Sequence, residues 1–253
     1  MRTRIFRTLG GLVAAATLVA AQNPKSPKER EAVVAVMQAT TPDAIAAAVD
    51  NLVTKFADTD FKAYALYRAA SAEQQKGDLT KALVYAERAA EADPKSLYGI
   101  QAMLIVSGEL ARTTREFDLD KEEKLARSDK LAKEAMDNIG AAPKPGPQVT
   151  DEQWAAVKKD ITAEAHKDLG LAAMARKKFD VAIAEFKVAV EGAATPDPSD
   201  MVRLASAYDQ AGQFDAAAPL LDKEINAPGM NPAIKNFALA EKKRNEDGKN
   251  GKK

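Results

Sequence analysis

Residues 63–94 read AYALYRAASAEQQKGDLTKALVYAERAAEADP, and this stretch decides the fold. Apolar residues recur every three or four positions on both sides of Gly77, a spacing typical of two amphipathic helices joined by a tight turn. Small side chains such as Ala70 and Ala82 fall where two such helices can cross closely. Pro94 then ends the unit. The stretch therefore predicts an antiparallel helix pair.

The same pattern returns further along the chain. Gly170 of the Leu169-Gly170 pair precedes Ala182 by the same twelve residues that separate Ala70 from Ala82. Another copy follows 35 residues later, with matching side chains at Leu204, Ala205, Tyr208, Gly212, Phe214, Ala217 and Leu221. Agreement at several positions predicts an internal repeat.

Units of this length and pattern resemble the tetratricopeptide repeat (TPR), a 34-residue helix–turn–helix unit that stacks on copies of itself. The resemblance covers about residues 29–243 and is best over 63–94 and 163–226. It implies an all-α helical solenoid of about ten or eleven helices in antiparallel pairs. The first helix of each pair would line a concave groove, and the protein would act as a non-enzymatic scaffold that holds a protein or peptide.

Composition agrees with packed helices. Hydrophobic residues make up 46% of the chain but aromatic residues only 6%, and the excess is largely Ala, which has the highest helix propensity. The 37 basic and 37 acidic residues balance, which does not favour nucleic acid as a partner. The chain has one His, no Cys and none of the common catalytic motifs. We therefore expect no catalytic residue, no metal site and no cofactor.

The amino terminus is typical of a secretory signal peptide. Three arginines precede an apolar run over residues 9–21 that ends in small residues. The run is too short to span a bilayer as a helix. We expect cleavage after Ala21, a periplasmic or secreted protein, and no stable membrane span after cleavage; the alternative is an uncleaved anchor. An exported member of this class resembles the periplasmic repeat proteins that help assemble the cell envelope.

Composition also predicts the boundaries along the chain. Proline and glycine mark the linkers, and helical periodicity marks the repeat blocks. The expected order is a signal peptide (1–21), a linker (22–28), an N-terminal TPR block (29–139), a Pro/Gly linker (140–150), a C-terminal TPR block with a capping helix (151–243) and a disordered tail (244–253). Whether the two blocks form one continuous stack stays open at this point.

The resemblance also implies which residues line the groove. They lie on the first helix of each repeat, on the side away from the small residues. In four repeats this side carries Tyr64, Tyr67, Ser71 and Gln74; Tyr98, Gln101 and Ile105; Lys167, Leu171 and Met174; and Val202, Ser206 and Asp209.

Tyrosine is well suited to anchor a ligand in such a groove, because it offers a large rigid face and one hydrogen-bonding tip. We expect the groove to grip an extended or helical segment through aromatic contacts and side-chain amides. One alternative is that Tyr64, Tyr67 and Tyr98 only pack between neighbouring repeats. Another is that the chain bridges parts of an envelope complex through its convex surface.

Overall fold

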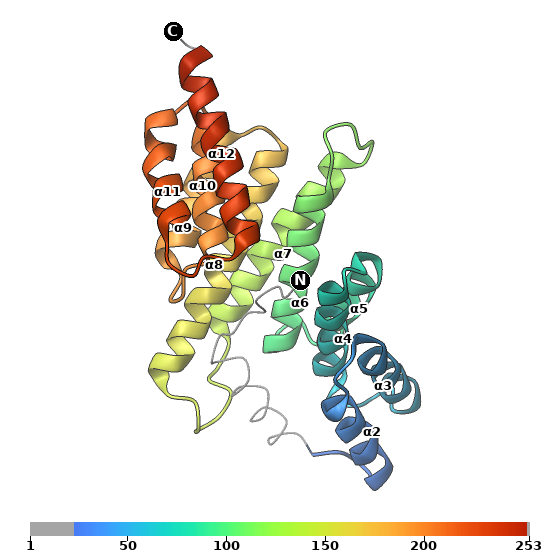
Figure 1. Cartoon of the computed structure of the whole chain (residues 1–253). Helices are drawn as coiled ribbons and strands as arrows, with labels where there is room; N and C mark the ends of the chain where they lie inside the picture. Colours follow the sequence, from blue (N-terminus) through green and yellow to red (C-terminus); the bar gives the residue numbers. More distant parts are fainter. Residues whose placement is uncertain (1–22, 252–253) are drawn as a thin grey trace.

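The computed structural model describes residues 23–251 and contains only helices there (Figure 1). The predicted signal peptide lies outside the described residues. The eleven helices of the described part are α2 (Pro27–Gln38), α3 (Pro42–Lys55), α4 (Lys62–Lys76), α5 (Leu79–Ala92), α6 (Leu97–Thr113), α7 (Lys121–Ala141), α8 (Asp151–Ala175), α9 (Phe179–Gly192), α10 (Pro198–Gln210), α11 (Phe214–Asn226) and α12 (Pro232–Gly251).

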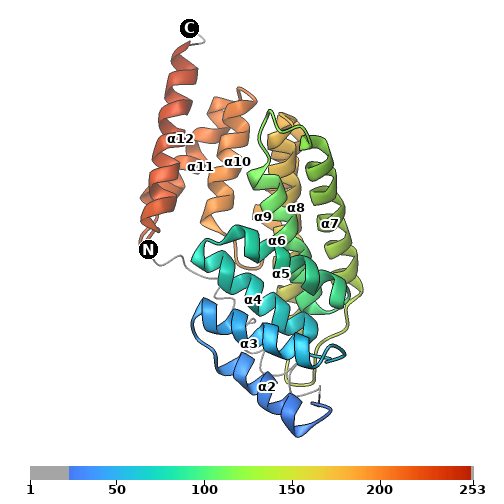
Figure 2. The same cartoon turned by 90° about the vertical axis from the view of Figure 1, so that its right-hand side faces the viewer.

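The helices form five antiparallel pairs and one closing helix. Each pair from α2·α3 to α10·α11 packs on the next, and α12 packs on both α10 and α11. The two views show the pairs following one another from α2 at one end of the molecule to α12 at the other (Figures 1 and 2). This arrangement is the all-α solenoid that the repeats predicted.

Local signals in the sequence set where several helices begin. The Ser26 side chain accepts a hydrogen bond from the N–H of Glu29, so α2 already begins at Pro27, inside the predicted linker 22–28. At α8 the Thr150 hydroxyl accepts from the Gln153 N–H, and the Gln153 side chain accepts from the Thr150 N–H. This reciprocal box satisfies two donors that a helix start otherwise leaves unpaired.

Three of the pairs close with the same left-handed turn. The backbone φ is 88° at Gly77, 59° at Lys177 and 71° at Gly212. In each turn the N–H of the following residue donates to the carbonyl five residues before it, at 2.9, 2.9 and 2.8 Å. Glycine adopts this conformation without strain, whereas Lys177 places a side chain there.

Small residues let the helices of a pair approach closely. Ala70, Ala82 and Ala182 have no exposed surface. A Cβ atom added to Gly170 would lie 2.6 Å from Cε1 of Phe186, so α8 and α9 cross at a distance that only glycine permits. The repeated small positions in the sequence are therefore helix-crossing positions.

The core continues across the predicted Pro/Gly linker. Helix α7 extends to Ala141, and residues 142–150 form the non-helical segment. One buried cluster joins Ile100 of α6 and Ile139 of α7 with Trp154 of α8, and Val149 of the segment itself is buried in it. Since α6 also contacts α8 directly, the two blocks form one continuous stack.

The prediction of a disordered tail is wrong for residues 244–251, which continue α12. Asn245 is 3% exposed, and its Nδ2 donates to Oδ1 of Asp209 at 2.5 Å and to the carbonyl of Phe214 at 2.8 Å. Lys249 forms an ion pair with Asp215 at 2.7 Å. These contacts with α10 and α11 order a segment whose polar composition alone favours disorder.

The left-handed turns give a stability prediction. Lys177→Gly removes the strain of a side chain at positive φ and should raise the free energy of unfolding by about 1 kcal/mol. Gly77→Ala places a Cβ atom at positive φ where no neighbouring atom blocks it. This substitution should lower the free energy of unfolding by about the same amount. Urea denaturation followed by circular dichroism measures both.

The matched control is Lys177→Ala, which also loses the ion pair between Lys177 and Glu116 but keeps a Cβ atom. We expect no gain in stability from this control. Equal stability of Lys177→Gly and Lys177→Ala would contradict the assignment of strain to this turn.

Candidate binding groove

The predicted groove residues lie on α4, α6, α8 and α10, the first helices of four successive pairs, which we call the inner row. Helix α6 contacts both α4 and α8. Gln74 of α4 donates from Nε2 to Oε1 of Glu109 on α6 at 3.1 Å. Across the row, the charge of Glu164 on α8 acts on the Tyr67 hydroxyl of α4. The structure therefore brings the predicted residues of α4, α6 and α8 to one region.

The three tyrosines pack against one another. The ring centroid of Tyr98 lies 5.0 Å from that of Tyr64 in an edge-on arrangement and 5.7 Å from that of Tyr67. Tyr64 and Tyr98 are 8% and 9% exposed, whereas Tyr67 is half-buried. Tyr64 and Tyr98 thus belong to the core between repeats, as the alternative expectation held, and Tyr67 keeps a partly open face.

The other predicted residues likewise divide into buried positions and partly exposed ones. Val202 has no exposed surface and packs against α11 and α12, so its prediction as a groove-lining residue is wrong. Asp209 is 9% exposed and bonds Asn245 of α12. Gln74 is exposed, and half-buried positions are occupied by Ser71, Gln101, Ile105, Lys167, Leu171, Met174 and Ser206.

Charged side chains gather on helices α8 and α10 of the inner row. Lys167 forms ion pairs with Glu164 and, at 3.5 Å, with Asp168. Arg203 of α10 pairs with Asp200 at 2.6 Å. We call this set the groove cluster; its members are Tyr67, Glu164, Lys167, Asp168, Asp200 and Arg203.

The groove cluster shifts the pKa values of its members. Burial raises the pKa of Asp200 to about 6, against the opposing effect of Lys167 and Arg203. Burial by itself lowers the pKa of Lys167, but the charges of Glu164, Asp168 and Asp200 outweigh it and raise that pKa. Burial raises the pKa of Tyr67, which a hydrogen bond with Ser71 partly offsets. The cluster therefore keeps Lys167 charged and raises the pKa of Asp200 above that of an ordinary carboxyl group.

Asp168 is the most deeply buried member. It has no exposed surface, and neither carboxyl oxygen has a hydrogen-bond partner. Its Oδ1 would lie 2.9 Å from a Cβ atom on Gly108, so glycine on α6 makes room for the carboxyl group. Burial raises the pKa of Asp168 to about 8, because an ionised carboxylate is poorly solvated there.

Sequence reasoning missed Glu164, Asp168, Asp200 and Arg203. Glu164 precedes Lys167, and Asp200 precedes Arg203, by three residues, the spacing of ion pairs on one helix face. That spacing is equally common on solvated faces. Only the packing of α6 against α8 shows that Asp168 is buried.

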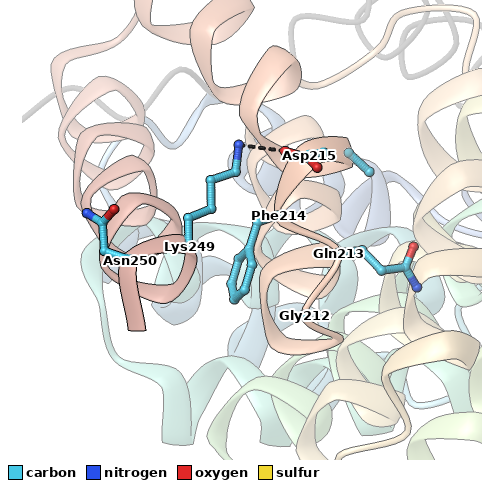
Figure 3. Close-up of a pocket in the computed structure, with 7 residues that line it drawn as sticks. Gly212, Gln213, Phe214, Asp215, Lys249 and Asn250 are labelled. Carbon is cyan, nitrogen blue, oxygen red and sulfur yellow. Dashed lines mark ion pairs between the residues drawn. The ribbon is translucent and has the colours of Figure 1, made fainter. Parts of the chain in front are cut away.

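A separate hollow lies outside the inner row, where the start of α11 meets the end of α12 (Figure 3). It measures about 620 Å³ and is lined by Gln213, Asp215 and Lys249, among others. Its Lys249–Asp215 ion pair belongs to the contacts that hold α12 in place. We assign this hollow to the packing of the last helix.

Residues 23–251 lack two further features. The described helices include none with the length and apolar character needed to cross a bilayer. The same residues contain no group of three or more His, Asp or Glu side chains placed to hold a metal ion.

The raised pKa of Asp168 gives a pH prediction. The carboxyl group ionises near pH 4 in the unfolded chain but only at about pH 8 in the folded one. Between these values the folded state holds a proton that the unfolded state has released, so the free energy of unfolding falls as the pH rises, and it levels off above pH 8. Asp168→Asn should remove about 1 kcal/mol per pH unit of this slope.

Urea denaturation at pH 5 to 9 tests this, with Asp137→Asn on the exposed side of α7 as the control. The control should keep the slope of the unsubstituted protein. The same slope in Asp168→Asn would show that Asp168 is ionised in the folded protein at neutral pH.

Comparison with known proteins finds a similar fold among solved structures. No protein-family model matches the chain, and no curated protein matches its sequence. Among solved structures, the chain is similar to a thermophilic TPR protein of Thermus thermophilus, with 18% sequence identity and a TM-score of 0.54. The match covers 79% of this chain and 90% of that one. At this level of identity the likeness concerns the fold alone: the chain has the architecture of a TPR solenoid.

Proposed function

We propose that the chain is a non-enzymatic scaffold whose inner row holds a segment of a protein partner. This proposal rests on the partly exposed side chains of the inner row. Helices α4, α6, α8 and α10 present half-buried side chains of mixed character, among them Tyr67, Gln101 and Lys167. Side chains that are partly covered in the free protein lose little freedom when a ligand covers the rest.

The chemistry of the row favours a peptide segment over a small molecule. Apolar surface comes from Ile105, Leu171 and Met174, and hydrogen-bonding groups come from Ser71 and Gln101. An extended or helical segment can use both kinds of contact along several helices. The groove cluster adds fixed charges in the middle, which would select the register of the bound segment.

We also propose that the protein is exported and acts in the periplasm or the cell envelope. The basic residues followed by the short apolar run at residues 1–21 support this. One structural neighbour is a TPR protein, a class in which stacked helix pairs expose an extended binding surface.

Photo-cross-linking tests the groove. A photoreactive residue at Gln101 in the inner row is compared with one at Val84 and one at Val188, which are 51% and 45% exposed on the second helices α5 and α9. In cell extract, we expect one discrete protein adduct from position 101. The partner found in this way is then purified for binding measurements.

Gln101→Trp should fill the groove and weaken binding of that partner at least about tenfold, which is about 1.4 kcal/mol. Val84→Trp is the matched control and should bind as the unsubstituted protein does. Both variants are checked for unchanged circular dichroism. Adducts from positions 84 and 188 alone would contradict the groove and favour a structural bridge through the outer surface.

A further inference from the structure

The loop between α6 and α7 holds two large apolar side chains in solvent. Phe117 is 90% exposed and Leu119 fully exposed. At this position three of the other pairs have a tight left-handed turn, whereas here residues 114–120 project from the end of the pair (Figure 1). Exposed apolar side chains of this size on a projecting loop mark an interaction site.

Polar contacts order this loop, which we call the finger (residues 115–120). The Asp118 carboxylate accepts a hydrogen bond from the N–H of Arg115 at 3.0 Å, and the Asp118 N–H donates to the Arg115 carbonyl at 3.3 Å. Lys124 forms ion pairs with Asp118 at 3.5 Å and Asp120 at 2.9 Å. The finger therefore presents its apolar side chains in a defined arrangement, which lowers the entropy cost of docking.

The finger is acidic. Residues 115–120 carry three carboxylates and one basic side chain, a net charge of −2, and the carboxylates pair with Lys124 and Lys177. Such a segment is repelled by anionic lipid and attracted to a basic surface. The surface that fits it combines apolar contact area with lysine or arginine.

The same molecule carries such a surface at the turn between α8 and α9. A hollow of about 490 Å³ there is bordered by two basic side chains and one acidic one; its lining residues are Lys177, Lys178, Phe179, Asp180, Val181, Gln210 and Ala211. Val181 is 48% exposed, so the apolar part of the hollow is open to solvent. The finger and this hollow lie side by side, since Lys177 pairs with Glu116 of the finger at 2.5 Å.

We propose that the finger of one copy docks into the hollow of a second copy. Phe117 and Leu119 would cover the apolar surface at Val181, and Lys178 would meet the carboxylates of the finger. Because finger and hollow are neighbours, one two-fold axis allows both contacts to form at once in a closed dimer. Two contacts of this size fall below the area of a stable interface, so the dimer is weak and sensitive to salt.

Sedimentation equilibrium tests the dimer on protein purified in the form that cells produce. At concentrations from about 20 μM to 1 mM we expect a reversible monomer–dimer equilibrium, weaker in 500 mM than in 50 mM NaCl. A finger variant (Phe117→Ser, Leu119→Ser) and a hollow variant (Lys178→Glu, Val181→Ser) should each raise the dissociation constant at least about tenfold. Val84→Ser, which removes an exposed valine on α5, should leave it unchanged.

A mixture of the two variants sharpens the test. The mixed dimer retains one intact finger–hollow contact, so it should form more readily than a dimer of either variant alone. A protein that is monomeric at 1 mM would overturn the proposal, as would a dimer that the finger variant does not weaken. Binding of the monomer to phosphatidylcholine vesicles, lost in the finger variant, would assign the finger to membranes instead.

Discussion

Close contact between helices at alanine and glycine is the constraint on which the structure depends. Ala70, Ala82 and Ala182 are fully buried, and Gly170 leaves no room for a Cβ atom beside Phe186. A helix pair that meets this closely buries only one side of itself, and the next pair must cover the rest. The core therefore runs from pair to pair, also across the predicted linker. The inner row follows, because stacking sets the first helices α4, α6 and α8 side by side and continues to α10 through α9.

The inner row contains buried ionisable groups, which a stack built for stability alone would avoid. Asp168 is fully buried without a hydrogen bond, and Asp200 has a pKa of about 6. Removing carboxyl groups from water costs free energy that ion pairs offset only in part. Groups with strongly shifted pKa values concentrate at functional sites, and this agrees with the proposed groove. Asp168 itself touches no solvent, so its influence on a ligand would pass through Lys167.

The candidate site could be predicted only in part. Helix positions on the inner row followed from the repeat register, and all the predicted residues lie on its four helices. Burial along the row did not follow, because it depends on which neighbour covers each position. Val202 is covered by α11 and α12. Tyr64 of α4 and Tyr98 of α6 are buried in the core between their two repeats. The ordered end of α12 was missed for the same reason: its polar side chains find partners on α10 and α11.

The sequence by itself determined the helices, their pairing and the turns between them. These depend on local signals such as the caps at Ser26 and Thr150 and on small residues repeated at a constant interval, all of which act within one or two turns of the chain. Tertiary structure alone decided the continuity of the stack, the burial of Asp168 and the side-by-side placement of the finger and its hollow. These features join segments tens of residues apart, and the environment of a side chain is set by whatever packs against it.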